Sequence, residues 1–161
     1  PDAPPSVQGT EEPMIEMPTL QAVDTQAPPV TPYAPEAGVW IDTPIGENAD
    51  HRFSLEFDPA EWELVEGELH AQLIHTSLAN CDISKTAGMG LGPGWSALNR
   101  MVMIGELEFM RTDLLLDGVL QFDTMYGGDP WVGFRIGQSN ISQACIDRAE
   151  VVLATLIVTA P

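Results

Sequence analysis

The sequence is short of basic residues, and this shortage excludes several classes of partner. Its 161 residues hold six Lys and Arg against 24 Asp and Glu, for a formal net charge of −18, and Lys85 is the only lysine. Binding to nucleic acid or to an anionic membrane surface requires clustered Lys and Arg. We therefore expect no nucleic-acid partner. Such acidity is consistent with a cell-surface protein kept soluble by charge repulsion, or with a saline habitat.

Long apolar runs are also missing. The longest, Val151 to Val158, has eight residues and includes Thr155. A membrane-spanning helix needs about 20 apolar residues, so no segment of this sequence is predicted to cross a bilayer. A lipid-modified cysteine upstream of Pro1 would be the only link to a membrane.

Cysteine is scarce, with only Cys81 and Cys145. The sequence has no CxxC pair, which argues against a zinc site. A Pro-rich acidic leader before a compact domain is typical of an exported protein after removal of its signal peptide. We therefore predict a Cys81–Cys145 disulfide and an extracytoplasmic location, secreted or at the cell surface. The alternatives are two buried thiols, or a Cys81 nucleophile served by His75.

Proline is abundant at the N-terminus. Residues 1–37 hold nine prolines, six carboxylates and no Lys or Arg, a composition that does not bury enough apolar surface to fold alone. We interpret 1–37 as a docking arm and 38–161 as a single domain. The most apolar stretch of the arm, Pro13 to Val23, is the predicted contact with a neighbouring subunit. The partner-docking residues would be Met14, Ile15, Met17, Leu20, Val23 and, where the arm meets the domain, Trp40.

The domain pattern predicts an α+β fold, with a mainly antiparallel sheet of about five strands and one C-terminal helix. Apolar and polar residues alternate from Phe53 to Asp58, which indicates a half-buried strand. Further strands are expected over Glu68 to Leu78 and over Met101 to Met110, where Gly105 would mark a bulge. A hairpin is expected from Val119–Tyr126 and Trp131–Ile136. The helix is expected from about Ile141 to Ile157, capped by Asn140.

The Gly-rich segment Thr86 to Trp95 (TAGMGLGPGW) is the most unusual local sequence of the domain. It lacks the GK[ST] of a P-loop and the flanking strand and helix of a dinucleotide-binding loop. We interpret it as a surface loop that Trp95 anchors to the sheet. The alternative is a ligand-contact loop formed by Gly88, Gly90, Gly92, Gly94 and Trp95.

Residues suited to catalysis or metal binding do not form a recognised pattern. His70 and His75 are five apart on an expected strand, which places them on opposite faces. The acids near Glu61 to Glu68 match no regular calcium loop, and a solvated acidic face explains them better. We therefore predict no metal, no cofactor and no enzyme activity. A hydrolase using His75 and nearby acids is the least favoured alternative.

The strand FSLEFDP, a tryptophan three residues after its proline, several antiparallel strands and a final apolar helix resemble the PsbP-like fold. That fold is an α/β/α sandwich found in photosystem extrinsic proteins. The resemblance covers about Val39 to Val158 and includes the motif DPAEW, Asp58 to Trp62. The sequence is also similar to uncharacterised bacterial surface lipoprotein domains. Both resemblances imply an accessory or assembly role.

Two functions remain as hypotheses. The first is a non-enzymatic, exported structural or accessory subunit of a surface assembly, whose arm docks on a neighbouring subunit. The second is a small-ligand-binding surface lipoprotein domain that uses the Gly-rich loop and the face bearing His70, Gln72 and Arg135.

Overall fold

The structure is a computed structural model that describes residues 3, 9 and 36–161. The arm residues Met14, Ile15, Met17, Leu20 and Val23 lie outside the described residues. The chain divides into two units, Pro1–Tyr33 and Ala34–Pro161. The described part forms β1 (Gly38–Asp42), β2 (Arg52–Phe57), β3 (Trp62–Glu66), β4 (Ala71–His75), β5 (Asp82–Lys85), β6 (Trp95–Ile104), β7 (Leu107–Leu116), β8 (Val119–Gly127), β9 (Val132–Ile136), α1 (Gln143–Leu153) and β10 (Ile157–Thr159).

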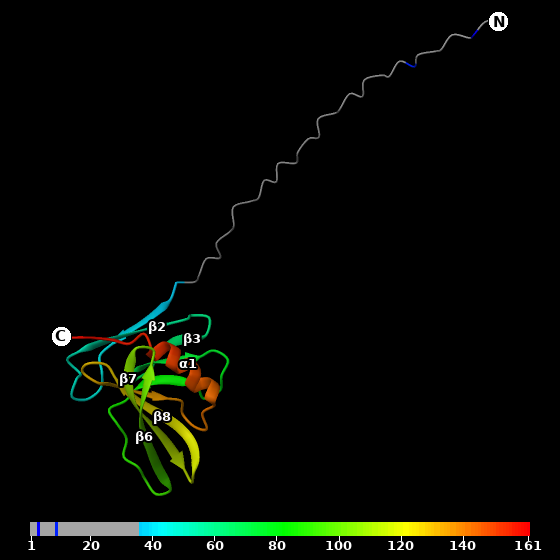
Figure 1. Ribbon diagram of the computed structural model, residues 1–161. Coiled ribbons are helices and arrows are strands. Elements are labelled where there is room, and N and C mark those ends of the chain that lie inside the picture. The colour runs from blue at the N-terminus through cyan, green and yellow to red at the C-terminus, as the bar shows by residue number, and fades with distance from the viewer. Residues whose placement is uncertain (1–2, 4–8, 10–35) are drawn as a thin grey trace. The chain divides into compact units, whose positions relative to one another are not determined.

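The strands form two antiparallel sheets (Figure 1). The small sheet has the order β1-β2-β10, and the large sheet has the order β3-β4-β5-β9-β8-β7-β6. The expected class, mainly antiparallel with one C-terminal helix, is confirmed. The expected number of about five strands is wrong, because the large sheet alone has seven.

A tight turn accounts for one of the missed strands. Met101 to Met110 is not one strand but parts of β6 and β7, which pair from Ile104↔Leu107 onward. Gly105 is therefore not a bulge; it is the first residue of a two-residue turn and has φ 61°. A second such turn, Asp117-Gly118, joins β7 to β8 with φ 49° and 79°. An Asp-Gly pair between apolar runs is a strong hairpin signal, because both residues must adopt positive φ.

The predicted hairpin of Val119–Tyr126 with Trp131–Ile136 is confirmed as β8 and β9. The bulge of the large sheet lies in the β7–β8 ladder, where the register shifts between Leu114 and Leu115. The partners of these two residues, Phe122 and Leu120, leave Gln121 as the extra residue. Its carbonyl accepts a hydrogen bond from Ile141 N at 3.1 Å, so the bulge positions the segment that leads into α1.

The helix is shorter than expected at both ends. Ser142, not Asn140, is the N-cap, and its hydroxyl accepts from Cys145 N at 3.2 Å. At the other end the chain leaves the helix after Leu153, and Ile157–Thr159 pairs with β2 as β10. This tail is rich in β-branched residues, which favour a strand once an unpaired edge is within reach.

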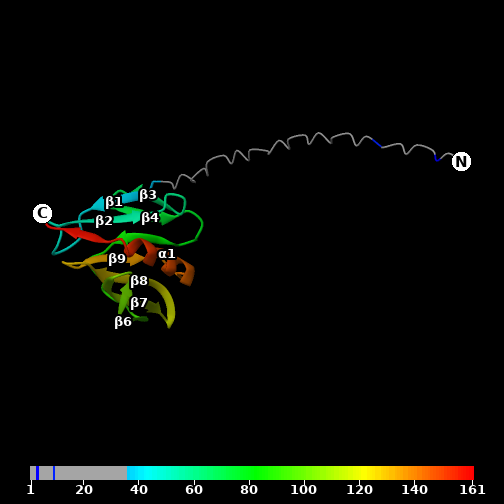
Figure 2. The ribbon, with the colours of Figure 1, turned by 45° about the horizontal axis from the view of Figure 1, so that its top comes forward.

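The core lies between the inner face of the large sheet and a layer formed by α1 and the small sheet. Figure 2 shows α1 between β2 and β9. Phe134 of β9 contacts both Trp40 and Phe53 of the small sheet, with ring centroids 6.4 and 5.2 Å apart. Trp40 is only 1 % exposed. The prediction that Trp40 anchors a partner is therefore corrected: β1, which the alternation did not reveal, turns this ring into its own domain.

The predicted disulfide is confirmed. Cys81 precedes β5, Cys145 lies in the first turn of α1, and their sulfur atoms are bonded with Cα atoms 5.5 Å apart. Both residues are buried, so the bond fastens the helix to the large sheet from within. A disulfide of this kind indicates an oxidising, extracytoplasmic environment.

Candidate functional site

The face of the large sheet that points away from α1, here called the outer face, carries a row of polar side chains across its strands. Gln72 of β4 pairs with Ser84 of β5, and Ser84 pairs with Arg135 of β9. Arg135 in turn pairs with Thr124 of β8. The row continues through Thr112 to Asn99, and Thr112 Oγ1 donates to Asn99 Oδ1 at 2.7 Å. Residues in register on one face lie side by side, so these groups form one polar row.

A groove of about 480 Å³ opens at the β4–β5–β9 end of this row. Its lining includes His70, Gln72 and Arg135, which are the three residues that the sequence suggested for a ligand-binding face. The Gly-rich loop contributes Thr86 and Met89. Ser84, Lys85, Ala71, Leu69 and Glu68 complete the lining. The structure thus brings together residues from three strands and two loops at one surface.

The glycines of the loop allow the backbone conformation that the loop adopts. Gly88 and Gly94 have φ of 112° and 81°, a region that favours glycine. Gly90 lies in open space, and Gly92 O accepts a hydrogen bond from Trp95 N at 3.3 Å. Trp95 begins β6 and contacts Phe122, with ring centroids 5.6 Å apart, so it anchors the loop to the sheet as expected.

Arg135 is the central cation of the groove. One of its terminal nitrogens lies 3.5 Å from Asp82 Oδ2, and its guanidinium carbon lies 5.9 Å from the centroid of the Phe122 ring. Its Nε is buried without a hydrogen-bond partner among the described residues. Asp82 is 1 % exposed, and burial raises the pKa of its carboxyl although Arg135 opposes this shift. The guanidinium therefore keeps donors that Asp82 does not occupy.

The inner face holds a buried charge network that the sequence analysis missed. Arg111 Nε donates to Asp113 Oδ1 at 2.9 Å, and another nitrogen of Arg111 lies 2.7 Å from Asp123 Oδ2. Arg100 binds both oxygens of Asp113 at 2.6 and 3.1 Å, and Glu150 of α1 lies 3.6 Å from Arg111. The signal was present in β7, where Arg111 and Asp113 occupy alternate positions and therefore share one face of the strand.

Burial dominates the electrostatics of this network. Asp113 and Asp123 are directly opposite each other on β7 and β8, and Asp123 is fully buried. Burial raises the pKa of Asp123 to about 7, against the opposing effect of Arg111. A buried carboxylate in such a position can stabilise the packing of α1 on the sheet only if an arginine compensates its charge. Its members are bound to one another within the domain, and we interpret the network as structural.

The alternative of a Cys81 nucleophile served by His75 does not form. Cys81 is bonded to Cys145, so it offers no free thiol. His75 Nδ1 accepts hydrogen bonds from Ser77 N and Leu78 N, at 3.2 and 3.1 Å, and its ring packs on Trp62 with centroids 4.9 Å apart. The side chain therefore holds the turn after β4.

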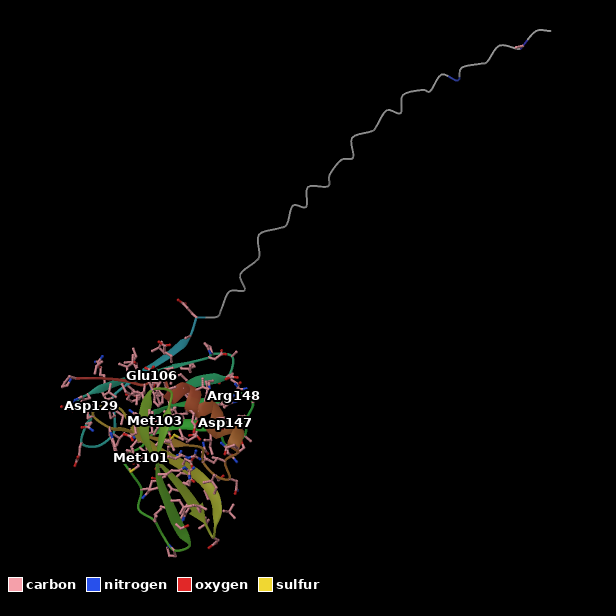
Figure 3. All side chains as sticks on the ribbon, viewed as in Figure 1. Met101, Met103, Glu106, Asp129, Asp147 and Arg148 are labelled. Atoms are coloured by element: carbon pink, nitrogen blue, oxygen red, sulfur yellow. A yellow bond between two sulfur atoms is a disulfide. The ribbon has the colours of Figure 1, made fainter. Side chains whose placement is uncertain are left out.

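The open edge of the large sheet is the second surface of interest. β6 is ten residues long, pairs with β7 on one side and has no strand on the other among the described residues. Met101 and Met103, 48 % and 65 % exposed, follow one another along this strand toward Glu106 in the turn (Figure 3). Figures 1 and 2 both place β6 at the end of the domain away from β2.

Neither a metal centre nor a membrane helix is evident in the described part of the chain. No group of three or more His, Cys, Asp or Glu there is arranged to hold a metal ion. Its helix is too short and too polar to cross a membrane. Comparisons with protein-family models, curated proteins and solved structures found no match to this chain. The resemblance to PsbP-like domains and to surface lipoprotein domains thus stays a prediction.

Proposed function

We propose that this chain is a non-enzymatic, exported accessory subunit of a surface assembly, and that partner chains bind along the open edge of β6. The observation that carries the proposal is the long, largely apolar strand β6, whose outer edge has no strand beside it among the described residues. An edge of this kind presents a row of free N–H and C=O groups to any extended chain. Native proteins usually protect such edges with charge, proline or a covering element, and β6 has only Arg100 among its ten residues.

The register of β6 identifies the backbone groups that point outward. The residues that flank a two-residue turn form a hydrogen-bonded pair, so Ile104 and Val102 bond to β7. By alternation, the N–H and C=O of Met103, Met101 and Asn99 point away from β7. An added strand would therefore hydrogen-bond to the backbone of these three residues. On the outer face of the sheet, their side chains would contact those of the added strand.

We propose the arm of a neighbouring copy as the added strand. Pro13 and Pro18 cannot donate backbone hydrogen bonds, but Thr19 to Asp24 (TLQAVD) contains no proline. This segment alternates polar and apolar residues over Thr19 to Ala22, as a strand with one buried face does. Recognition by strand addition supplies affinity through the backbone and selectivity through alternate side chains.

The test is the molecular mass of the full chain in solution, measured by light scattering over a range of concentrations. We expect the native chain to associate, and the double substitution Met101→Lys with Met103→Lys to abolish association. Val119→Lys with Val151→Lys changes two other exposed apolar residues and should have no effect. A native chain that stays monomeric, or an edge variant that associates like the native chain, contradicts the proposal.

Deletion of residues 1–36 tests the role of the arm separately. Every strand and the helix that the structure describes lie beyond this segment, so the shortened chain should retain the far-UV circular dichroism of the domain. It should lose association while its β6 edge remains available to an added full-length chain. Undiminished association of the shortened chain would show that two β6 edges pair directly, without the arm.

A further inference from the structure

We propose that the groove on the outer face binds a small organic anion, a carboxylate with a short apolar chain, and that Arg135 holds its carboxylate. This inference concerns a different surface from the β6 edge and does not depend on the assembly role. It rests on the geometry of Arg135, on the neutral donors beside it and on the apolar side chains at the rim.

Arg135 differs from four of the other five Lys and Arg residues in how its donors are used. Lys85, Arg100, Arg111 and Arg148 each have a nitrogen within 3.1 Å of a carboxylate oxygen. For Arg135 the nearest such oxygen is at 3.5 Å and belongs to Asp82, which is buried. Lys85 also lines the groove, but its ammonium is bound by Asp42 at 2.9 Å and by Thr43 O at 3.0 Å. Arg135 is thus the cation available to a ligand in this groove.

The cross-strand register supplies further donors for an anion. Ser84 pairs with Arg135 and Gln72 pairs with Ser84, so a hydroxyl and an amide lie in line with the guanidinium. Planar, two-point binding of a carboxylate is the geometry that arginine favours. The neutral donors beside it can orient the second oxygen without adding charge.

Two apolar side chains at the rim of the groove can contact the apolar half of the ligand. Leu69, before β4, and Met89, in the Gly-rich loop, are both large, exposed and part of the lining. Binding grooves combine such apolar contacts with a few placed polar groups, and methionine adapts to varied apolar shapes. An inorganic anion would leave these two side chains in water and should therefore bind more weakly.

Glu68 is the one carboxylate in the lining, and it opposes an anion. It lies in the exposed turn before β4, where water screens its charge more than at Arg135. Removal of this charge should therefore strengthen binding moderately, while removal of the Arg135 charge should weaken it. The two substitutions shift affinity in opposite directions, which a nonspecific apolar contact would not do.

The test uses the full chain and titration calorimetry with hexanoate and, separately, inorganic phosphate. We expect hexanoate to bind saturably, with a Kd that is millimolar or tighter. Its affinity should fall at least about tenfold in Arg135→Gln, which is a modest loss for one charged contact. Its affinity should rise about threefold in Glu68→Gln. Arg52→Gln, which removes a cation on β2 outside the groove lining, is the matched control and should bind like the native chain.

Circular dichroism of each variant checks that it is folded. If Arg135→Gln does not fold, Gln72→Glu provides the second test, because it places a carboxylate in the polar row of the groove and should weaken hexanoate about tenfold. The proposal is overturned if hexanoate does not saturate, or if Arg135→Gln and Arg52→Gln bind it equally. Phosphate binding as tight as hexanoate would overturn the apolar part of the assignment.

Discussion

The two faces of the large sheet use charge in opposite ways. On the inner face, Arg111 is bound by Asp113 and Asp123 beneath α1, and its donors are filled within the domain. On the outer face, Arg135 has a single distant carboxylate and opens onto a groove. The same strands β8 and β9 contribute to both faces, so alternation along a strand separates a structural charge from an available one.

The comparison shows that charge alone does not indicate function. A buried ion pair is expensive to desolvate, and removal of one partner leaves an uncompensated charge in the core. The inner network is therefore intolerant of substitution although it meets no ligand. The outer groove and the β6 edge should tolerate substitution and respond instead in binding.

Two tryptophans give the sharpest contrast in stability. Trp40 packs in the core between Phe53 and Phe134, whereas Trp131 is 46 % exposed. Trp40→Ala should lower the free energy of unfolding by roughly 3–5 kcal/mol, and Trp131→Ala by less than about 1 kcal/mol. Urea unfolding followed by circular dichroism measures both. Equal losses in the two variants would mean that the inner layer does not form the main core.

Removal of the disulfide should have the next largest effect. Cys81 and Cys145 are 64 residues apart, so their bond restricts a long loop of the unfolded chain. The double substitution to alanine should cost roughly 2–4 kcal/mol, the usual range for a disulfide. Reducing agent should lower the midpoint of urea unfolding of the native chain to that of the variant. It should leave the midpoint of the variant unchanged. If reduction lowers both midpoints alike, its effect does not come from this bond.

The inner network should make stability depend on pH. The pKa of Asp123 is raised from 3.8 to about 7 in the folded chain, so the folded state holds this proton more tightly than the unfolded state. The contribution of Asp123 to stability therefore falls as pH rises from about 4 to about 7, and it is not regained above that window.

Asp123→Asn cannot titrate and should escape this loss. The unfolding free energy of the variant minus that of the native chain should therefore increase from about pH 4 to about pH 7. We expect an increase on the order of a few kcal/mol. Asp147→Asn, on the exposed surface of α1 (Figure 3), is the control for loss of a carboxylate at the surface. A native-minus-variant difference that is flat in pH for Asp123→Asn would contradict the assignment of this proton.

Sequence reasoning succeeded where the determinant was local or covalent. Alternation at Phe53 and Leu55, the hairpin of β8 with β9 and the cysteine pairing were all predictable. It failed where long-range pairing competed with local preference, as in Thr155 to Thr159, which left the helix to complete the small sheet. The face bearing Gln72 and Arg135 was suggested by the sequence, but the place of Ser84 between them depended on cross-strand register, which neither composition nor spacing specifies.

The outer edge should show the smallest effect on stability. Met103→Ala removes an exposed side chain of β6 and should change the free energy of unfolding by less than about 0.5 kcal/mol. The same substitution should weaken association measurably in light scattering, because its contacts lie between chains. A large loss of stability would instead place Met103 in the core of its own domain.

Amide hydrogen exchange along β6 tests the central claim most directly. In the isolated chain at low concentration, the outward amides of Met101 and Met103 should exchange rapidly, while the amide of Val102, bonded to β7, should be protected. At concentrations where the chain associates, the amides of Met101 and Met103 should become protected and that of Val102 should change little. Association that leaves the amides of Met101 and Met103 as exchangeable as before would contradict binding at this edge.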